Sequence, residues 1–94
     1  MHIREFNSVL SHANGTATNA SAVALAGNAD RAYLLIQNQD AAAYVYTRTD
    51  GSAATANGAC LRIDPGKAWE PKVVPTGNIT LISNGTAVYH IVYA

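Results

Sequence analysis

Histidine and cysteine side chains are the first candidates for chemistry in this sequence, and there are few of them. His2, His12 and His90 are the only histidines, and Cys60 is the only cysteine. A metal site needs several such ligands at characteristic spacing, whereas these four residues are scattered along the chain. A cysteine nucleophile needs a positioned base beside it, and a single cysteine excludes an internal disulfide. We therefore predict no metal site, no cofactor and a structural thiol at Cys60.

Carboxylates could act in pairs, as they do in glycoside hydrolysis. Two of the six acids, Asp50 and Asp64, stand in the turn sequences Asp50-Gly51 and Asp64-Pro65-Gly66, where such side chains stabilise the turn. No glycine-rich segment has the lysine and helix that a phosphate-binding loop requires. We therefore expect no catalytic residues and no enzymatic activity. A deep pocket holding Asp40, Asp50 or His90 would instead indicate an enzyme.

The five tyrosines are the third group with a possible functional role: Tyr33, Tyr44, Tyr46, Tyr89 and Tyr93. Aromatic side chains on a sheet can stack on bases or sugars, but a nucleic-acid-binding sheet would combine them with many basic residues. Tyrosines also bury a large area at protein interfaces with few rotatable bonds. Three roles stay open for them: core packing, a protein interface, and the binding of carbohydrate or nucleic acid.

Turn residues divide the chain into short segments that must position these side chains. Asn14-Gly15, Asp50-Gly51, Asn57-Gly58, Asn84-Gly85 and Pro65-Gly66 are turn dipeptides. Runs of strand length lie between the turn signals, at residues 17–26, 32–38, 43–48, 59–63, 68–74, 78–83 and 87–93. This spacing predicts an all-β protein, a small antiparallel β-sandwich or barrel of the jelly-roll kind.

Alternation along each strand assigns its side chains to two faces. Residues 32–38 and 87–93 carry apolar side chains on both faces, which is typical of central strands or of strands half-covered by another subunit. The expected core consists of Leu34, Ile36, Val45, Leu61, Ile63, Trp69, Val73, Ile79, Leu81, Val88 and Ile91. Residues 30–94 are expected to form the sandwich, and residues 1–29 an extended N-terminal arm or a first strand with its loops.

The amino-acid composition limits the kinds of partner that the protein can attract. Only 13% of the 94 residues are charged, against about 25% in a typical soluble domain, and the formal net charge is zero. Electrostatic attraction to nucleic acid or to an anionic membrane is therefore not expected. The sequence begins without a signal-peptide pattern and has no apolar run of membrane-spanning length, so we expect synthesis in the cytosol.

Several segments together resemble a known group of proteins. They are 31–38, 44–46, the Asp50-Gly51 turn, 61–66, 69–71, 74–83, and a closing Tyr89-x-Ile91-x-Tyr93. Over residues 30–94 the chain is similar to small β-sandwich virion proteins of tailed bacteriophages, of the type that coats capsids as decoration or cement proteins. The resemblance implies a non-enzymatic structural protein that is made in the host cytoplasm and located in the virion.

The resemblance also implies the partners. These would be the major capsid protein lattice and further copies of the chain itself, with a trimer as the expected homo-oligomer and Tyr33, Tyr89 and Tyr93 as candidates for the subunit contact. Residues 1–30 would reach a neighbour or the shell. The alternative is a phage tail or receptor-binding module that recognises carbohydrate through Trp69 and the tyrosines.

Overall fold

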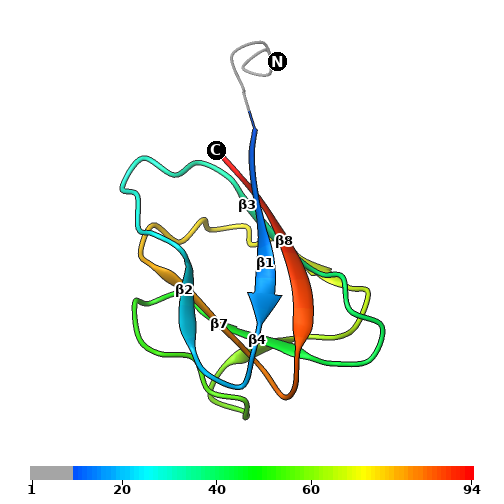
Figure 1. The fold of residues 1–94 in the computed structure, drawn as a ribbon. Coiled ribbons are helices and arrows are strands. Elements are labelled where there is room, and N and C mark those ends of the chain that lie inside the picture. The colour runs from blue at the N-terminus through cyan, green and yellow to red at the C-terminus, as the bar shows by residue number, and fades with distance from the viewer. Residues whose placement is uncertain (1–9) are drawn as a thin grey trace.

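The computed structural model describes residues 10–94 (Figure 1). These residues form eight β-strands, most of them short. The strands are β1 (Ser11–Ala17), β2 (Ala22–Leu25), β3 (Leu34–Asn38), β4 (Val45–Arg48), β5 (Leu61–Ile63), β6 (Ala68–Trp69), β7 (Ile79–Ser83) and β8 (Ala87–Tyr93). Within the described range, no helix is long and apolar enough to cross a membrane. Residues 1–9, the beginning of the expected N-terminal arm, lie outside the described residues.

The strands form two antiparallel sheets of four strands each. Sheet A has the order β1-β8-β3-β6, and sheet B has the order β2-β7-β4-β5. The pairs are nested, because β1 pairs with β8, β2 with β7, β3 with β6 and β4 with β5. Such nesting, divided over two sheets, is the arrangement of an eight-stranded jelly roll. The predicted all-β, jelly-roll-like sandwich is therefore confirmed.

The core lies between the sheets and consists mainly of aliphatic side chains. Seven of the predicted core residues are buried there: Leu34, Ile36, Val45, Ile63, Ile79, Leu81 and Ile91. Trp69 is half-buried and packs against this cluster. The segments 32–38 and 87–93, which carry apolar side chains on both faces, contain β3 and β8. Both are central strands of sheet A.

Three predicted core residues are exposed, so that part of the prediction is wrong. Val73 is 87% exposed, because Pro71 has no N–H group to continue the ladder with β3 and the strand ends at Trp69. Val88 is 46% exposed because it lies on the outer side of β8. Leu61 does share the inner side of β5 with Ile63, but it is 42% exposed because β5 is an edge strand.

The interpretation of Asn14-Gly15 as a turn is also wrong, because both residues lie inside β1. Gly15 is paired with Tyr89 of β8, and the tyrosine ring covers it. A Cβ atom on residue 15 would stand 2.7 Å from the Tyr89 hydroxyl oxygen. Glycine thus makes room for the ring. The expected strand 17–26 is interrupted between Ala17 and Ala22, and its two parts belong to different sheets.

A buried amide, that of Asn38, connects three segments at one end of the sandwich. Its Nδ2 group donates to the carbonyl oxygens of Ala43 (2.9 Å) and Ile63 (3.0 Å), and its Oδ1 accepts from the backbone N–H of Asp40 at 2.9 Å. Its backbone exchanges two further bonds with Gly66 and Lys67. The side chain is fully buried, and all three of these side-chain bonds go to backbone groups. Asn38 therefore fixes the β3–β4 loop, the end of β5 and the turn before β6.

A second buried polar side chain, Arg31, anchors loops elsewhere in the sandwich. Its Nη1 donates to the carbonyl oxygens of Pro75 (2.5 Å) and Gly77 (3.1 Å), and its Nη2 donates to that of Ala26 (2.6 Å). Burial lowers the pKa of Arg31 from its ordinary value. The guanidinium thus ties the segment after β2 to the segment before β7.

Replacing Asn38 by aspartate should destabilise the protein strongly at neutral pH. The carboxylate would face the carbonyl oxygens of Ala43 and Ile63, and two donated hydrogen bonds would become repulsive contacts. We expect Asn38→Asp to lower the free energy of unfolding by about 3 kcal/mol or more at pH 7. The pKa of the new buried carboxyl would be raised in the folded state, so the loss should shrink as the pH falls and the group becomes protonated. Urea denaturation at pH 7 and pH 4 measures both effects.

Gln37→Glu is the matched control, because it makes the same chemical change one residue away, on the outer side of β3. It should change stability by less than about 0.5 kcal/mol. Equal losses in the two variants would contradict the role assigned to the Asn38 amide.

Candidate interaction surface

The three tyrosines proposed for a subunit contact do not lie on one surface. Tyr89 and Tyr93 share the inner side of β8 with Ile91, and both are half-buried against the core. Tyr33 precedes β3 and alternates with the buried Leu34, which directs it to the outer side of sheet A. The sequence could not separate the two sides of β8, because both are apolar.

Tyr33 has a partner on the same chain. Its hydroxyl donates to the Glu70 carboxylate at 2.6 Å, and this bond raises the pKa of Tyr33. Burial also raises the pKa of Tyr89. Glu70 directly follows β6, so the Tyr33–Glu70 bond lies at the rim of sheet A, where β3 and β6 are neighbours.

The outer face of sheet A carries no charged strand residue. We define this face by the outward-pointing residues of its four strands: His12, Asn14, Thr16, Leu35, Gln37, Ala68, Val88, His90 and Val92. The register places Val92 of β8 opposite Leu35 of β3, so two apolar side chains are neighbours. His12 of β1 is opposite Val92 on its other side. The face is thus a continuous, uncharged sheet surface with small polar groups among aliphatic ones.

The outer side of sheet B is different, because charged residues occupy it. Arg48 and Asp50 form an ion pair at 2.9 Å, and Arg62 and Asp64 form another at 2.8 Å. Hydrogen bonds from the Arg48 side chain and the Ser52 backbone lower the pKa of Asp50 to about 2. Solvated ion pairs keep this side wet, so the outer face of sheet A is the better candidate for a contact with another protein.

A groove lies along β5, β6 and the turn that joins them. β5 and β6 are edge strands of different sheets, joined by the turn Asp64-Pro65-Gly66-Lys67. The Lys67 N–H donates to the Asp64 carbonyl oxygen at 3.0 Å, and Gly66 has a φ of 74°, which suits glycine at this turn position. The groove has a volume of about 420 Å³. It is a consequence of the turn that carries the chain from one sheet to the other.

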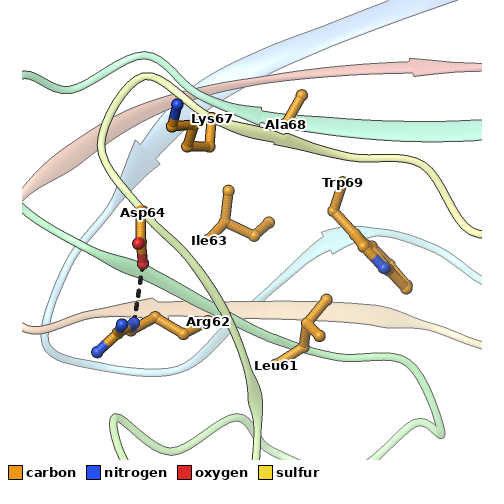
Figure 2. Close-up of a pocket in the computed structure, with 7 residues that line it drawn as sticks. All are labelled: Leu61, Arg62, Ile63, Asp64, Lys67, Ala68 and Trp69. Carbon is orange, nitrogen blue, oxygen red and sulfur yellow. Dashed lines mark hydrogen bonds and ion pairs between the residues drawn. The ribbon is translucent and has the colours of Figure 1, made fainter.

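The lining of this groove is apolar on one side and charged on the other. Figure 2 shows Trp69 and Leu61 together, with the Arg62–Asp64 ion pair across the groove. Ile63 lies between them, and Lys67 stands beside the turn. An aromatic side chain next to polar groups in an open groove is one way in which proteins hold small polar ligands.

The other residues singled out for chemistry serve local structure. Asp40 accepts from the backbone amides of Ala43 (2.7 Å) and Ala42 (2.9 Å), which lower its pKa. Cys60 accepts a bond from the Thr55 N–H at its Sγ atom, 3.2 Å away. Among residues 10–94, no group of three or more His, Cys, Asp or Glu side chains could hold a metal ion.

One pair of neighbouring side chains, His12 and His90, is not predicted from the sequence. His12 and His90, 78 positions apart, lie in contact on the outer face of sheet A. Their proximity depends on the pairing of β1 with β8, and β1 was not predicted because its Asn14-Gly15 dipeptide has the composition of a turn. The alternation in residues 11–17, once recognised, would have placed His12 on the same side as Asn14.

No family model, curated protein or solved structure matches this chain.

Trp69 should contribute to stability as well as lining the groove. The ring packs against the core from the edge strand β6 while remaining partly exposed. We expect Trp69→Ala to lower the free energy of unfolding by about 2–3 kcal/mol, somewhat less than for a fully buried tryptophan. Circular dichroism melts measure this, since the variant has no tryptophan fluorescence. Val73→Ala, at a highly exposed position two residues after Pro71, is the control and should melt like the parent. A Trp69→Ala melt that coincides with the parent would show that the ring does not support the fold.

Proposed function

We propose that this chain is a non-enzymatic structural protein of a tailed bacteriophage virion, a decoration or cement protein that binds the outside of the head. The observation that carries the proposal is the uncharged, partly apolar outer face of sheet A. The expectation from the strand-and-turn pattern of residues 30–94, which suggests small β-sandwich virion proteins, points in the same direction. The fold itself does not discriminate, because jelly rolls occur in both viral capsid and lectin domains.

A lattice-binding protein has particular physical needs, and this surface meets them. Leu35, Val88 and Val92 offer apolar area, while Gln37 and Asn14 offer hydrogen bonds without the desolvation cost of a full charge. A net charge of zero limits repulsion between crowded copies. Each contact can be weak, since a repeating lattice presents many sites and an oligomer engages several of them at once.

The proposal includes self-association, with a trimer that matches local threefold positions of a capsid. The subunit contact would involve Tyr33, whose outward ring lies at the rim of sheet A. Tyr89 and Tyr93, which face inward, would act by supporting the strand that carries the outer face. Sedimentation velocity of the full chain at micromolar concentration is the first step of the test, and a monomer at that stage would count against the oligomer.

Co-sedimentation with heads of the encoding phage should show saturable binding of the full chain. Val88→Lys places an ammonium group in the middle strand pair of the outer face, and burying it without a partner costs more than about 1.4 kcal/mol, so we expect binding at least about tenfold weaker. Val73→Lys makes the same change in the segment between β6 and β7 and should bind like the parent. Failure of the parent chain to pellet with heads would reject the proposal, and equal binding by both variants would reject the outer face of sheet A as the contact.

A second candidate function is a carbohydrate-recognition module of a phage tail or receptor-binding protein, and the groove favours it. Trp69 could stack on a sugar ring while the Arg62–Asp64 pair and Lys67 bond its hydroxyls. Trp69 is the only tryptophan, so a glycan bound there should change the intrinsic fluorescence of the protein. Saturable quenching by a host surface glycan, abolished in Asp64→Ala and kept in Asp50→Ala, is expected under this function. The absence of any saturable change across host glycans would exclude it.

A further inference from the structure

Two histidines converge on the outer face of sheet A. In the antiparallel ladder, His12 is opposite Val92 and His90 is opposite Asn14, so the two imidazoles are diagonal neighbours on adjacent strands. His12 Nδ1 lies 2.8 Å from His90 Nε2, with ring centroids 5.0 Å apart and ring planes inclined at 50°. The two rings therefore contact each other through nitrogen atoms and are not stacked face to face.

The distance is that of a hydrogen bond between the two ring nitrogens. One nitrogen donates and the other accepts, and the tautomers of the two rings decide which is which. A neutral imidazole nitrogen with a lone pair directed toward a second imidazole is also the donor that Zn²⁺ and related ions use. The two nitrogens therefore lie close enough together for one metal ion to bind both.

Binding of one ion by both rings requires a local rearrangement of the two side chains. Two Zn–N bonds of about 2.0–2.1 Å at a tetrahedral angle place the nitrogens about 3.3 Å apart. The rings would have to separate by about half an ångström from their present 2.8 Å, and each would have to turn so that its nitrogen points to a common ion beside the line that joins the two nitrogens. His12 is exposed and His90 only partly covered, so small side-chain rotations can provide that separation without moving β1 or β8.

The surroundings favour a cation of a particular chemical class. The strand residues of the outer face of sheet A include no Lys or Arg that would repel a cation and no Asp or Glu that would attract Ca²⁺ or Mg²⁺. Imidazole nitrogens select Zn²⁺, Cu²⁺ and Ni²⁺. In the part of the chain that the structure describes, no third His, Cys, Asp or Glu joins the pair.

We propose that His12 and His90 form a two-imidazole binding site for a divalent transition-metal ion of the zinc class. The ion binds His12 Nδ1 and His90 Nε2 and thereby links the edge strand β1 to the central strand β8. Because only the folded chain brings these two residues together, the ion stabilises the folded state by mass action. The inference is independent of binding to a phage head.

Titration of the full chain with ZnCl₂ at pH 7.5 tests the site. We expect one saturable Zn²⁺ per chain by calorimetry, a higher melting temperature, and perturbed ring signals of both His12 and His90 in NMR spectra. Loss of a partner that only supports a metal ligand already weakens binding by about 10- to 100-fold. His12→Gln and His90→Gln, which remove a ligand, should each weaken binding by at least about tenfold. CaCl₂ at the same concentrations should have no effect, because Ca²⁺ prefers oxygen ligands.

His2→Gln is the matched control, because His2 is the only other histidine in the chain. It should bind Zn²⁺ like the parent. The proposal is overturned if the parent shows no saturable binding, if His12→Gln and His90→Gln both bind normally, or if His2→Gln loses binding to the same extent. The NMR measurement on the unaltered protein keeps the test valid even if a variant folds poorly: unshifted His12 and His90 signals at saturating Zn²⁺ would also reject the site.

Discussion

The Asn38 amide is the interaction on which the arrangement of one end of this sandwich depends. It is fully buried, and it spends its two donors and one acceptor on backbone groups of the β3–β4 loop and of β5. Such a network is stabilising only when it is complete, because each unpaired buried group would carry its full desolvation cost. Through the backbone bonds to Gly66 and Lys67, the same residue sets where β5 ends and β6 begins, and thereby the shape of the groove.

The jelly roll converts a weakly charged sequence into a molecule with two unlike sides. Arg48 and Arg62 lie with their carboxylate partners, Asp50 and Asp64, on the outer side of sheet B and near the 64–67 turn. The outer face of sheet A receives the uncharged residues of β1, β3 and β8. The balance of charges in the composition therefore hides an uneven distribution, which only the strand pairing creates. A contact surface can arise in this way without any residue that looks functional in the sequence.

β-prone runs beside turn signals make parts of the fold predictable from the sequence, and runs of small residues do not. The sequence predicts a strand at 87–93, where β8 occurs, because seven mostly β-prone residues follow the Asn84-Gly85 turn signal. β1 was missed because its inner side consists of Ala13, Gly15 and Ala17, whose burial becomes favourable only after β8 has been placed beside it. The contact between His12 and His90 is tertiary for the same reason. Which side of β8 faces inward could not be derived, since valines on one side and tyrosines on the other are similarly apolar.

The nested pairing also governs how the chain can reach this structure. The ladder between β1 and β8 joins Ser11 to Tyr93, so it closes nearly the longest loop that the described chain allows (Figure 1). The entropy of closing a long loop must be overcome before its contacts stabilise anything, and folds dominated by such pairings fold slowly. The β4–β5 pair, by contrast, spans only a short loop. During synthesis β1 is made before its partner β8, so it stays unpaired until β8 has been made. Its low content of large apolar side chains is then an advantage, because an unpaired strand of this composition has little tendency to aggregate.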